Sequence, residues 1–248
     1  MVYKSDSQPG APAAAEPVPE RRRPWWRRPW MIPLAIVNVV FLTYIWRPYV
    51  TLDPATATVQ LVAGIPAHYF IVLVHVFGSG TAMICAFFQV WPWLRRKHPR
   101  VHARTGRLYM VAVTAATVTA VALQVIRNVR DGSVQAGAPG LYITALLWLA
   151  VSLAGYRAAR RGDYVLHGRW MTYSFALAMT NIYSRPLYLM LEGSSPLVLN
   201  SYFEMVGWLP WIVHLGLARW WLGPAGTRGR QHREPRQPRT EIPQGAAR

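Results

Sequence analysis

Two basic connectors between long apolar runs contain histidines that could ligate a metal or a haem. The first connector, residues 95–109, holds six Lys or Arg residues together with His98 and His102. The second, residues 157–169, holds His167 among four arginines. Because imidazole nitrogens ligate both haem iron and zinc, these connectors are the first candidate sites of chemistry in the chain.

His102 and His167 are the first candidate pair. Both stand at the expected inner ends of their helices, and each is followed two residues later by an arginine. Imidazoles from two helices can bind a haem iron from opposite sides, while arginines pair with its propionates. The arginines in question are Arg104, Arg107 and Arg169. The alternative, which residue type alone favours, is that both histidines are interfacial and lie beside lipid phosphates.

The same connectors also contain a spacing that is compatible with zinc. His98 and His102 are four residues apart. Asp163 and His167 have the same spacing, and all four side chains are of types that zinc accepts. Pro99 disfavours helical geometry at His98, which would splay the first pair. The alternative is that Asp163 binds no metal and only begins a helix.

Two more histidines, His75 and His214, fall at middle depth in expected spans. His75 is about ten residues, or roughly 15 Å, from the outer end of its helix, and His214 lies at a comparable depth in the last helix. Polar groups at this depth are costly and usually face a cavity or a neighbouring helix. His75 and His214 could be a second pair of axial haem ligands, or two core histidines that are hydrogen-bonded to neighbouring helices. The second role is the commoner one.

An ion pair is expected between Arg185 and Glu204, which fall at similar depths in the outer parts of the last two helices. A structural clamp between these helices is the default interpretation. The functional alternative is an anchor for a quinone headgroup or an acidic solute, with Asn181 and Tyr183 assisting.

Composition indicates that a membrane scaffold positions these residues. Of the 248 residues, 52% are hydrophobic and 15% are charged, against about a quarter charged in soluble domains. Apolar runs of spanning length recur, and the charges lie between them. The net charge of +17 comes from Lys and Arg beside the spans, so we expect anionic lipid headgroups as partners and no nucleic acid. The single cysteine, Cys85, excludes an intrachain disulfide.

The distribution of Lys and Arg predicts the topology. Of 27 such residues, 23 fall in or beside the two tails and in the two basic connectors, which are therefore predicted to be cytoplasmic. We expect an all-α, up-and-down bundle of six transmembrane helices in the bacterial inner membrane, with both termini cytoplasmic. The expected helices cover residues 30–46, 65–93, 108–126, 141–156, 170–191 and 202–221. Residues 1–29 and 223–248 are expected to be disordered basic tails.

Together, these motifs resemble a family of bacterial predicted membrane proteins described as a domain of unknown function. The resemblance covers about residues 68–221 and implies six helices. It rests on His75 with Gly78, on residues 102–109 and 161–171, on Arg185, and on Trp208 with Trp211. More loosely, the layout resembles the cytochrome b561 and ferric-reductase type of membrane bundle, in which paired histidines hold haem between helices.

The first functional hypothesis is a haem b protein or a quinone-linked protein that transfers electrons. Its axial ligands would be His102 with His167 and, for a second haem, His75 with His214. The alternative is a non-enzymatic membrane component without a cofactor, either an assembly partner or a protein that binds lipids or small solutes. A zinc-dependent membrane hydrolase is third. Since the sequence has no Gly-rich nucleotide fingerprint, any electron donor would be a quinone or another protein.

Overall fold

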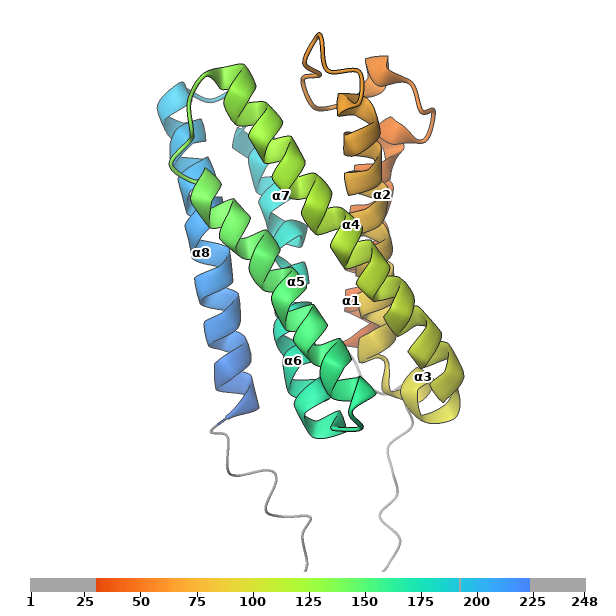
Figure 1. Ribbon diagram of the computed structural model, residues 1–248. Helices are drawn as coiled ribbons and strands as arrows, with labels where there is room; N and C mark the ends of the chain where they lie inside the picture. The colour runs from red at the N-terminus through yellow and green to blue at the C-terminus, as the bar shows by residue number, and fades with distance from the viewer. Residues whose placement is uncertain (1–29, 192, 224–248) are drawn as a thin grey trace, which may run out of the picture.

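A computed structural model describes residues 30–191 and 193–223, except for the side chains of Asn181, Arg185 and Leu189. Within this part of the chain every regular element is helical, which confirms the all-α class (Figure 1). The predicted tails lie outside the described residues apart from Gly223. The elements are α1 Met31–Trp46, η2 Arg47–Tyr49, η3 Pro54–Thr56, α2 His68–Val90, α3 Pro92–Lys97, α4 Pro99–Asp131, α5 Ala138–Arg160, α6 Tyr164–Ala178, α7 Thr180–Leu191 and α8 Pro196–Leu222.

Four of the described helices are long and apolar enough to cross a membrane. They are Met31–Tyr49, His68–Val90, Pro99–Asp131 and Ala138–Arg160. The segment expected as a fifth span is divided at Met179 into α6 of 15 residues and α7 of 12 residues. The 27 residues of α8 include tryptophans, two prolines and Glu204, and this helix is not among the four candidate spans. The chain is therefore a multi-pass membrane protein with four candidate spans.

The helices form one bundle in which α2 runs antiparallel to α4 and α5 to α6, whereas α5 and α8 run in the same direction. The closest pairs are α2 with α4 and α5 with α6, and α8 packs on α5 and α6. Figure 1 shows α3, the α5–α6 turn, the start of α1 and the end of α8 at one end of the bundle. Both basic connectors lie at this end, which we call the basic end. The loops between α1 and α2, α4 and α5, and α7 and α8 lie at the other end.

The basic connectors are more helical than the sequence pattern indicates. The 33-residue α4 includes the whole expected span 108–126 and extends beyond it in both directions. Its first residue is Pro99, at a position where the missing N–H of proline is tolerated. Gly132 ends the helix with a φ of 62°. Charged residues such as Arg and Lys are good helix formers, so charge here marks the membrane boundary but not a helix boundary.

Close backbone contact joins α5 to α8 near the end of the bundle opposite the basic end. A Cβ atom added to Gly137 would collide with the carbonyl of Phe203, and one added to Gly140 would collide with the carbonyl of Gly207. A Cβ atom on Gly207 would in turn collide with the carbonyl of Gly137. Small residues of this kind let membrane helices approach closely and gain van der Waals contact.

A buried polar network joins α4, α5 and α6 in the core. The Tyr109 hydroxyl and the Ser174 hydroxyl are 2.6 Å apart, and Ser174 is also 2.6 Å from the hydroxyl of Ser152. The indole N–H of Trp148 donates to the Tyr109 hydroxyl at 3.0 Å. Both serines are fully buried and Tyr109 is 1% exposed. Each helix of this trio thus contributes a polar group whose partner lies on a neighbouring helix.

Gly207→Ala should destabilise the bundle, because its methyl group has no space unless α5 and α8 separate along their contact. We expect a loss of about 2 kcal/mol or more in the free energy of unfolding. Gly216→Ala on the same helix is the matched control, since nothing lies within 4 Å of its added Cβ atom. Thermal unfolding of both variants in detergent provides the measurement. Equal stability of the two variants would contradict the close contact.

Tyr109→Phe should also destabilise the protein, because it leaves the Trp148 indole N–H without its partner and removes one partner of Ser174. The expected loss is about 1–2 kcal/mol, since hydrogen bonds between membrane helices contribute modestly. Tyr164→Phe removes a hydroxyl from a side chain that is 74% exposed and should leave stability unchanged. Unfolding titrations in mixed micelles would compare the two, and an unaffected Tyr109→Phe variant would contradict a stabilising network.

Candidate functional site

His167 is held in a defined orientation at the basic end. Its Nδ1 atom lies 2.8 Å from the carbonyl oxygen of Gly155. Because a carbonyl only accepts, Nδ1 carries the hydrogen of the neutral ring and Nε2 keeps its lone pair. Gly155 lets α5 and α6 approach each other closely, because a Cβ atom added at this position would lie 2.9 Å from the sulfur of Met171 on α6. A backbone carbonyl commonly orients a ligating histidine in this way.

His102 lies in the first turn of α4 at the same end of the bundle. Its ring is half-buried, and its Nδ1 atom is buried without a hydrogen-bond partner among the described residues. His167 and Arg95 are both near enough to act electrostatically on this imidazole. Gln89 of α2 fixes the turn by donating to the His102 carbonyl at 2.9 Å. The structure therefore brings His102 and His167 to one region, on different helices.

The three arginines expected near this pair lie on the same helices. Arg104 and Arg107 are exposed on α4, and Arg169 is half-buried on α6. Together with the neighbouring Lys and Arg residues they make this end of the bundle strongly basic. Such an end favours anionic groups, either propionates or lipid phosphates.

The four residues of the zinc hypothesis do not form one cluster. His98 is exposed, and its ring packs edge-on against Trp93 with 4.8 Å between centroids. Asp163 accepts a hydrogen bond from the backbone N–H of Leu166 at 2.9 Å and so caps the start of α6. Within residues 30–191 and 193–223 no group of three or more His, Cys, Asp or Glu side chains is placed to hold a metal ion.

His75 is half-buried against α4. Its Nδ1 atom is 3.1 Å from the carbonyl oxygen of Ala116 and 3.3 Å from the hydroxyl of Thr119. The carbonyl requires that Nδ1 be the donor in the neutral ring. His75 thereby joins α2 to α4, and it also lines two cavities described below.

His214 fills the break between α6 and α7. Its Nδ1 atom is 3.0 Å from the hydroxyl of Thr180, and the ring also hydrogen-bonds the backbone of Ala176. The Tyr183 ring packs edge-on against it at 5.6 Å. His214 thus supplies polar partners where the helix is interrupted. The two histidines therefore have different partners: His75 contacts α4, and His214 contacts the break between α6 and α7.

The outer group of predicted site residues is described only in part. The side chains of Asn181 and Arg185 lie outside the described residues, so the expected pair with Glu204 has no described geometry. Glu204 is exposed on α8, and Tyr183 is exposed apart from its contact with His214.

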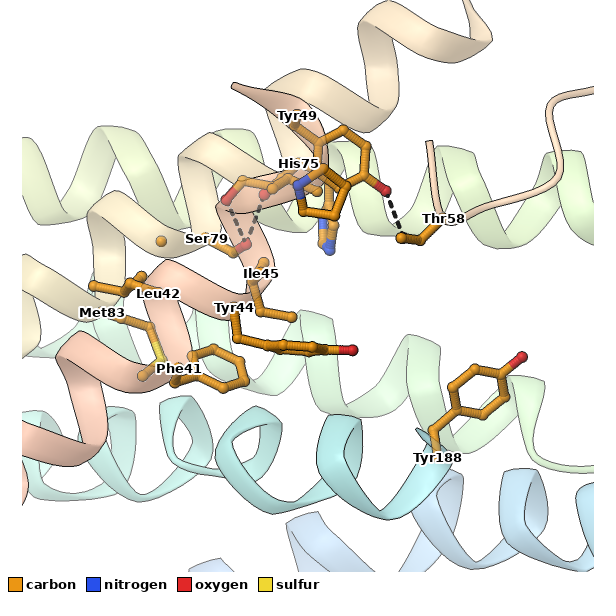
Figure 2. A pocket seen from close by; sticks show the side chains of 13 residues that line it. Phe41, Leu42, Tyr44, Ile45, Tyr49, Thr58, His75, Ser79, Met83 and Tyr188 are labelled. Atoms are coloured by element: carbon orange, nitrogen blue, oxygen red, sulfur yellow. Dashed lines mark hydrogen bonds between the residues drawn. The ribbon is translucent and has the colours of Figure 1, made fainter. Parts of the chain in front are cut away.

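Two cavities around His75 were not expected from the sequence. The smaller, of about 270 Å³, lies mainly between α1 and α2, and Figure 2 shows His75 and Ser79 on its wall together with Tyr44, Tyr49 and Tyr188. The larger, of about 640 Å³, lies among α2, α4, α5, α7 and α8 and extends to Arg127 and Arg130. The sequence signal that could have indicated the larger cavity was the helical spacing of Gln124 and Arg127 at the end of an apolar run.

The comparisons with known proteins identify a family. The model of the family described as "Predicted membrane protein (DUF2306)" matches residues 72–222, more than half of the chain. No curated protein matches the chain. No solved structure matches it either, so the likeness to cytochrome b561 bundles has no support from that comparison. The chain belongs to the DUF2306 family of predicted membrane proteins.

Proposed function

We propose that the chain crosses the bacterial cytoplasmic membrane six times, with both termini in the cytoplasm. The four candidate spans would be joined by α6 with α7 as a fifth crossing and by α8 as a sixth. The 27 residues of α8 correspond to about 40 Å, enough to cross the apolar layer. The break at Met179 is compatible with membrane depth because its backbone groups keep their partners: its N–H donates to the Phe175 carbonyl and its carbonyl accepts from the Ile182 N–H, both at 3.1 Å.

We further propose that the protein holds a b-type haem between His102 and His167 and transfers electrons. The observation that carries this proposal is that His102 of α4 and His167 of α6 lie at the same end of the bundle, within electrostatic range of each other, with His167 oriented by the Gly155 carbonyl. Bis-histidine ligation needs one nitrogen lone pair from each of two helices. The Nε2 atom of His167 is suited to this role by its tautomer.

The residues present fit a haem in two further respects. The buried Nδ1 atom of His102 has no hydrogen-bond partner in the described structure, and a buried polar atom left in this state is costly. Arg169 is half-buried on α6, where it could pair with a propionate. The haem would supply one-electron transfer, and this chain would orient the ligands and surround them with positive charge.

A second candidate is a non-enzymatic protein that binds a lipid or a small solute. The cavity of about 640 Å³ favours it, because its volume is within the range of ligand pockets. A zinc-dependent hydrolase is disfavoured, since His98 packs against Trp93 and Asp163 caps the start of α6.

The haem proposal predicts a visible spectrum. Protein expressed with haem precursor and purified in detergent should show near-stoichiometric Soret and α bands after reduction with dithionite. His102→Ala and His167→Ala should each lose most of the bound haem, because each removes one axial ligand.

His98→Ala is the matched control, because this histidine lies beside the pair in sequence but is exposed against Trp93. It should retain the full spectrum. A colourless protein that unfolds cooperatively would contradict haem binding. Bands that survive in both ligand variants would contradict this pair as the ligands.

A further inference from the structure

We propose that the larger cavity binds an amphiphile with one carboxylate headgroup and an apolar tail. The carboxylate would lie on Arg127 at the cavity mouth, and the tail would extend inward between α2, α4 and α5. Arg127 directly follows the apolar part of α4, at the end of the bundle opposite His102. This proposal therefore concerns a different site from the haem proposal and does not depend on it.

Arg127 is the group at the mouth that lacks a full set of partners. Its guanidinium lies over the ring of Phe203 at 4.2 Å from the centroid, and its Nε atom is buried without a hydrogen bond. The nearest carboxylate oxygen, from Asp131, is 3.7 Å from this Nε atom, beyond hydrogen-bonding distance. A planar guanidinium held in this way can offer two parallel N–H donors to a carboxylate.

The mouth also carries an excess of positive charge. Arg130 takes one oxygen of Asp131 at 2.7 Å, so a single carboxylate serves both arginines. Among the described residues, one positive charge at this position has no counter-ion of its own. Because a half-buried cation is stabilised by a nearby anion, the arrangement favours a ligand with one negative charge.

The other polar groups near the mouth are already paired. Gln124 donates to the side-chain oxygen of Asn128 at 3.1 Å, and Asn128 donates to the Tyr142 hydroxyl at 3.2 Å. His68 accepts from the backbone N–H of Val62 at 3.0 Å. These contacts leave Arg127 as the best-placed group to receive a ligand headgroup.

The interior of the cavity suits an apolar tail. Two of its hydroxyl groups donate to backbone carbonyls: Ser79 bonds the His75 carbonyl at 2.6 Å, and Thr144 bonds that of Gly140 at 2.9 Å. The hydroxyl of Thr180 pairs with His214 at 3.0 Å. Hydroxyls satisfied in this way place little polar demand on a ligand. Apolar side chains from α2 and α4 also line the wall, and they include Val72, Val76, Ala116, Ala120, Val121 and Leu123.

The test compares palmitate with 1-hexadecanol, which has the same chain length but no charge. Full-length protein in dodecyl maltoside at mildly alkaline pH should be stabilised against thermal unfolding by palmitate, in a concentration-dependent manner. Hexadecanol should have little effect, because it cannot form the charged pair with Arg127. Equal stabilisation by both compounds, or none by palmitate, would overturn the proposal.

Two variants assign the effect to the cavity. Arg127→Gln should weaken palmitate binding about tenfold or more, because a charge-assisted pair is lost. Ala120→Phe should reduce binding by filling the cavity while Arg127 stays in place. The control is Arg157→Gln, which removes an exposed arginine at the basic end. Unchanged palmitate binding in Arg127→Gln would overturn the proposal even if Ala120→Phe failed to fold.

His102→Ala separates the two sites. It should keep full stabilisation by palmitate whether or not it loses haem. Loss of palmitate binding in this variant, with cooperative unfolding retained, would overturn the assignment of the ligand to the cavity.

Discussion

The hydrogen bonds among Tyr109, Ser152 and Ser174 determine how α4, α5 and α6 sit against one another. In an apolar layer a buried hydroxyl has no water to bond, so its partner must come from the protein. The Tyr109 and Ser174 hydroxyls are 2.6 Å apart across α4 and α6, and Ser152 adds α5 to the network. This contact fixes α4 relative to α6, and the relative position of these helices places the first turn of α4 near His167.

The same requirement for internal partners distinguishes the histidines. His214 bonds Thr180 and the backbone of Ala176 where α6 is interrupted, so it serves the integrity of a broken helix. His75 bonds the Ala116 carbonyl and holds α2 against α4. His167 bonds the Gly155 carbonyl through Nδ1, whereas the buried Nδ1 of His102 has no such bond. Residue type alone could not separate these four roles, because three of them depend on a backbone atom of another helix and the fourth is marked by the lack of such a partner.

Charge and hydropathy were sufficient to predict an all-helical membrane bundle and the two basic connectors. They did not predict the break at Met179, because the proline of residues 170–191, Pro186, lies inside α7 and not at the break. The contact beside the break, between Thr180 and His214, joins segments that are far apart in the sequence. Of the two readings of Asp163, the structure shows the helix cap, which requires only a backbone N–H three residues later. The cavity around His75 was not predictable, since its volume is set by the distances between helices that are not adjacent in sequence.

The long helix α4 connects two regions in which polar atoms lack ordinary partners. At one end the buried Nδ1 of His102 has no hydrogen bond, and at the other the Nε of Arg127 has none. Between them, the described polar groups of α4 are well paired, as Tyr109 and Thr119 illustrate. Within α4, the two unsatisfied atoms carry a local cost of the kind found where proteins bind other molecules. Three further buried polar atoms of the described structure, on Asn38, Tyr69 and Trp211, also lack a partner. The two proposed sites would therefore lie at opposite ends of α4, one offering imidazole lone pairs to a haem iron and the other offering a guanidinium to an anion.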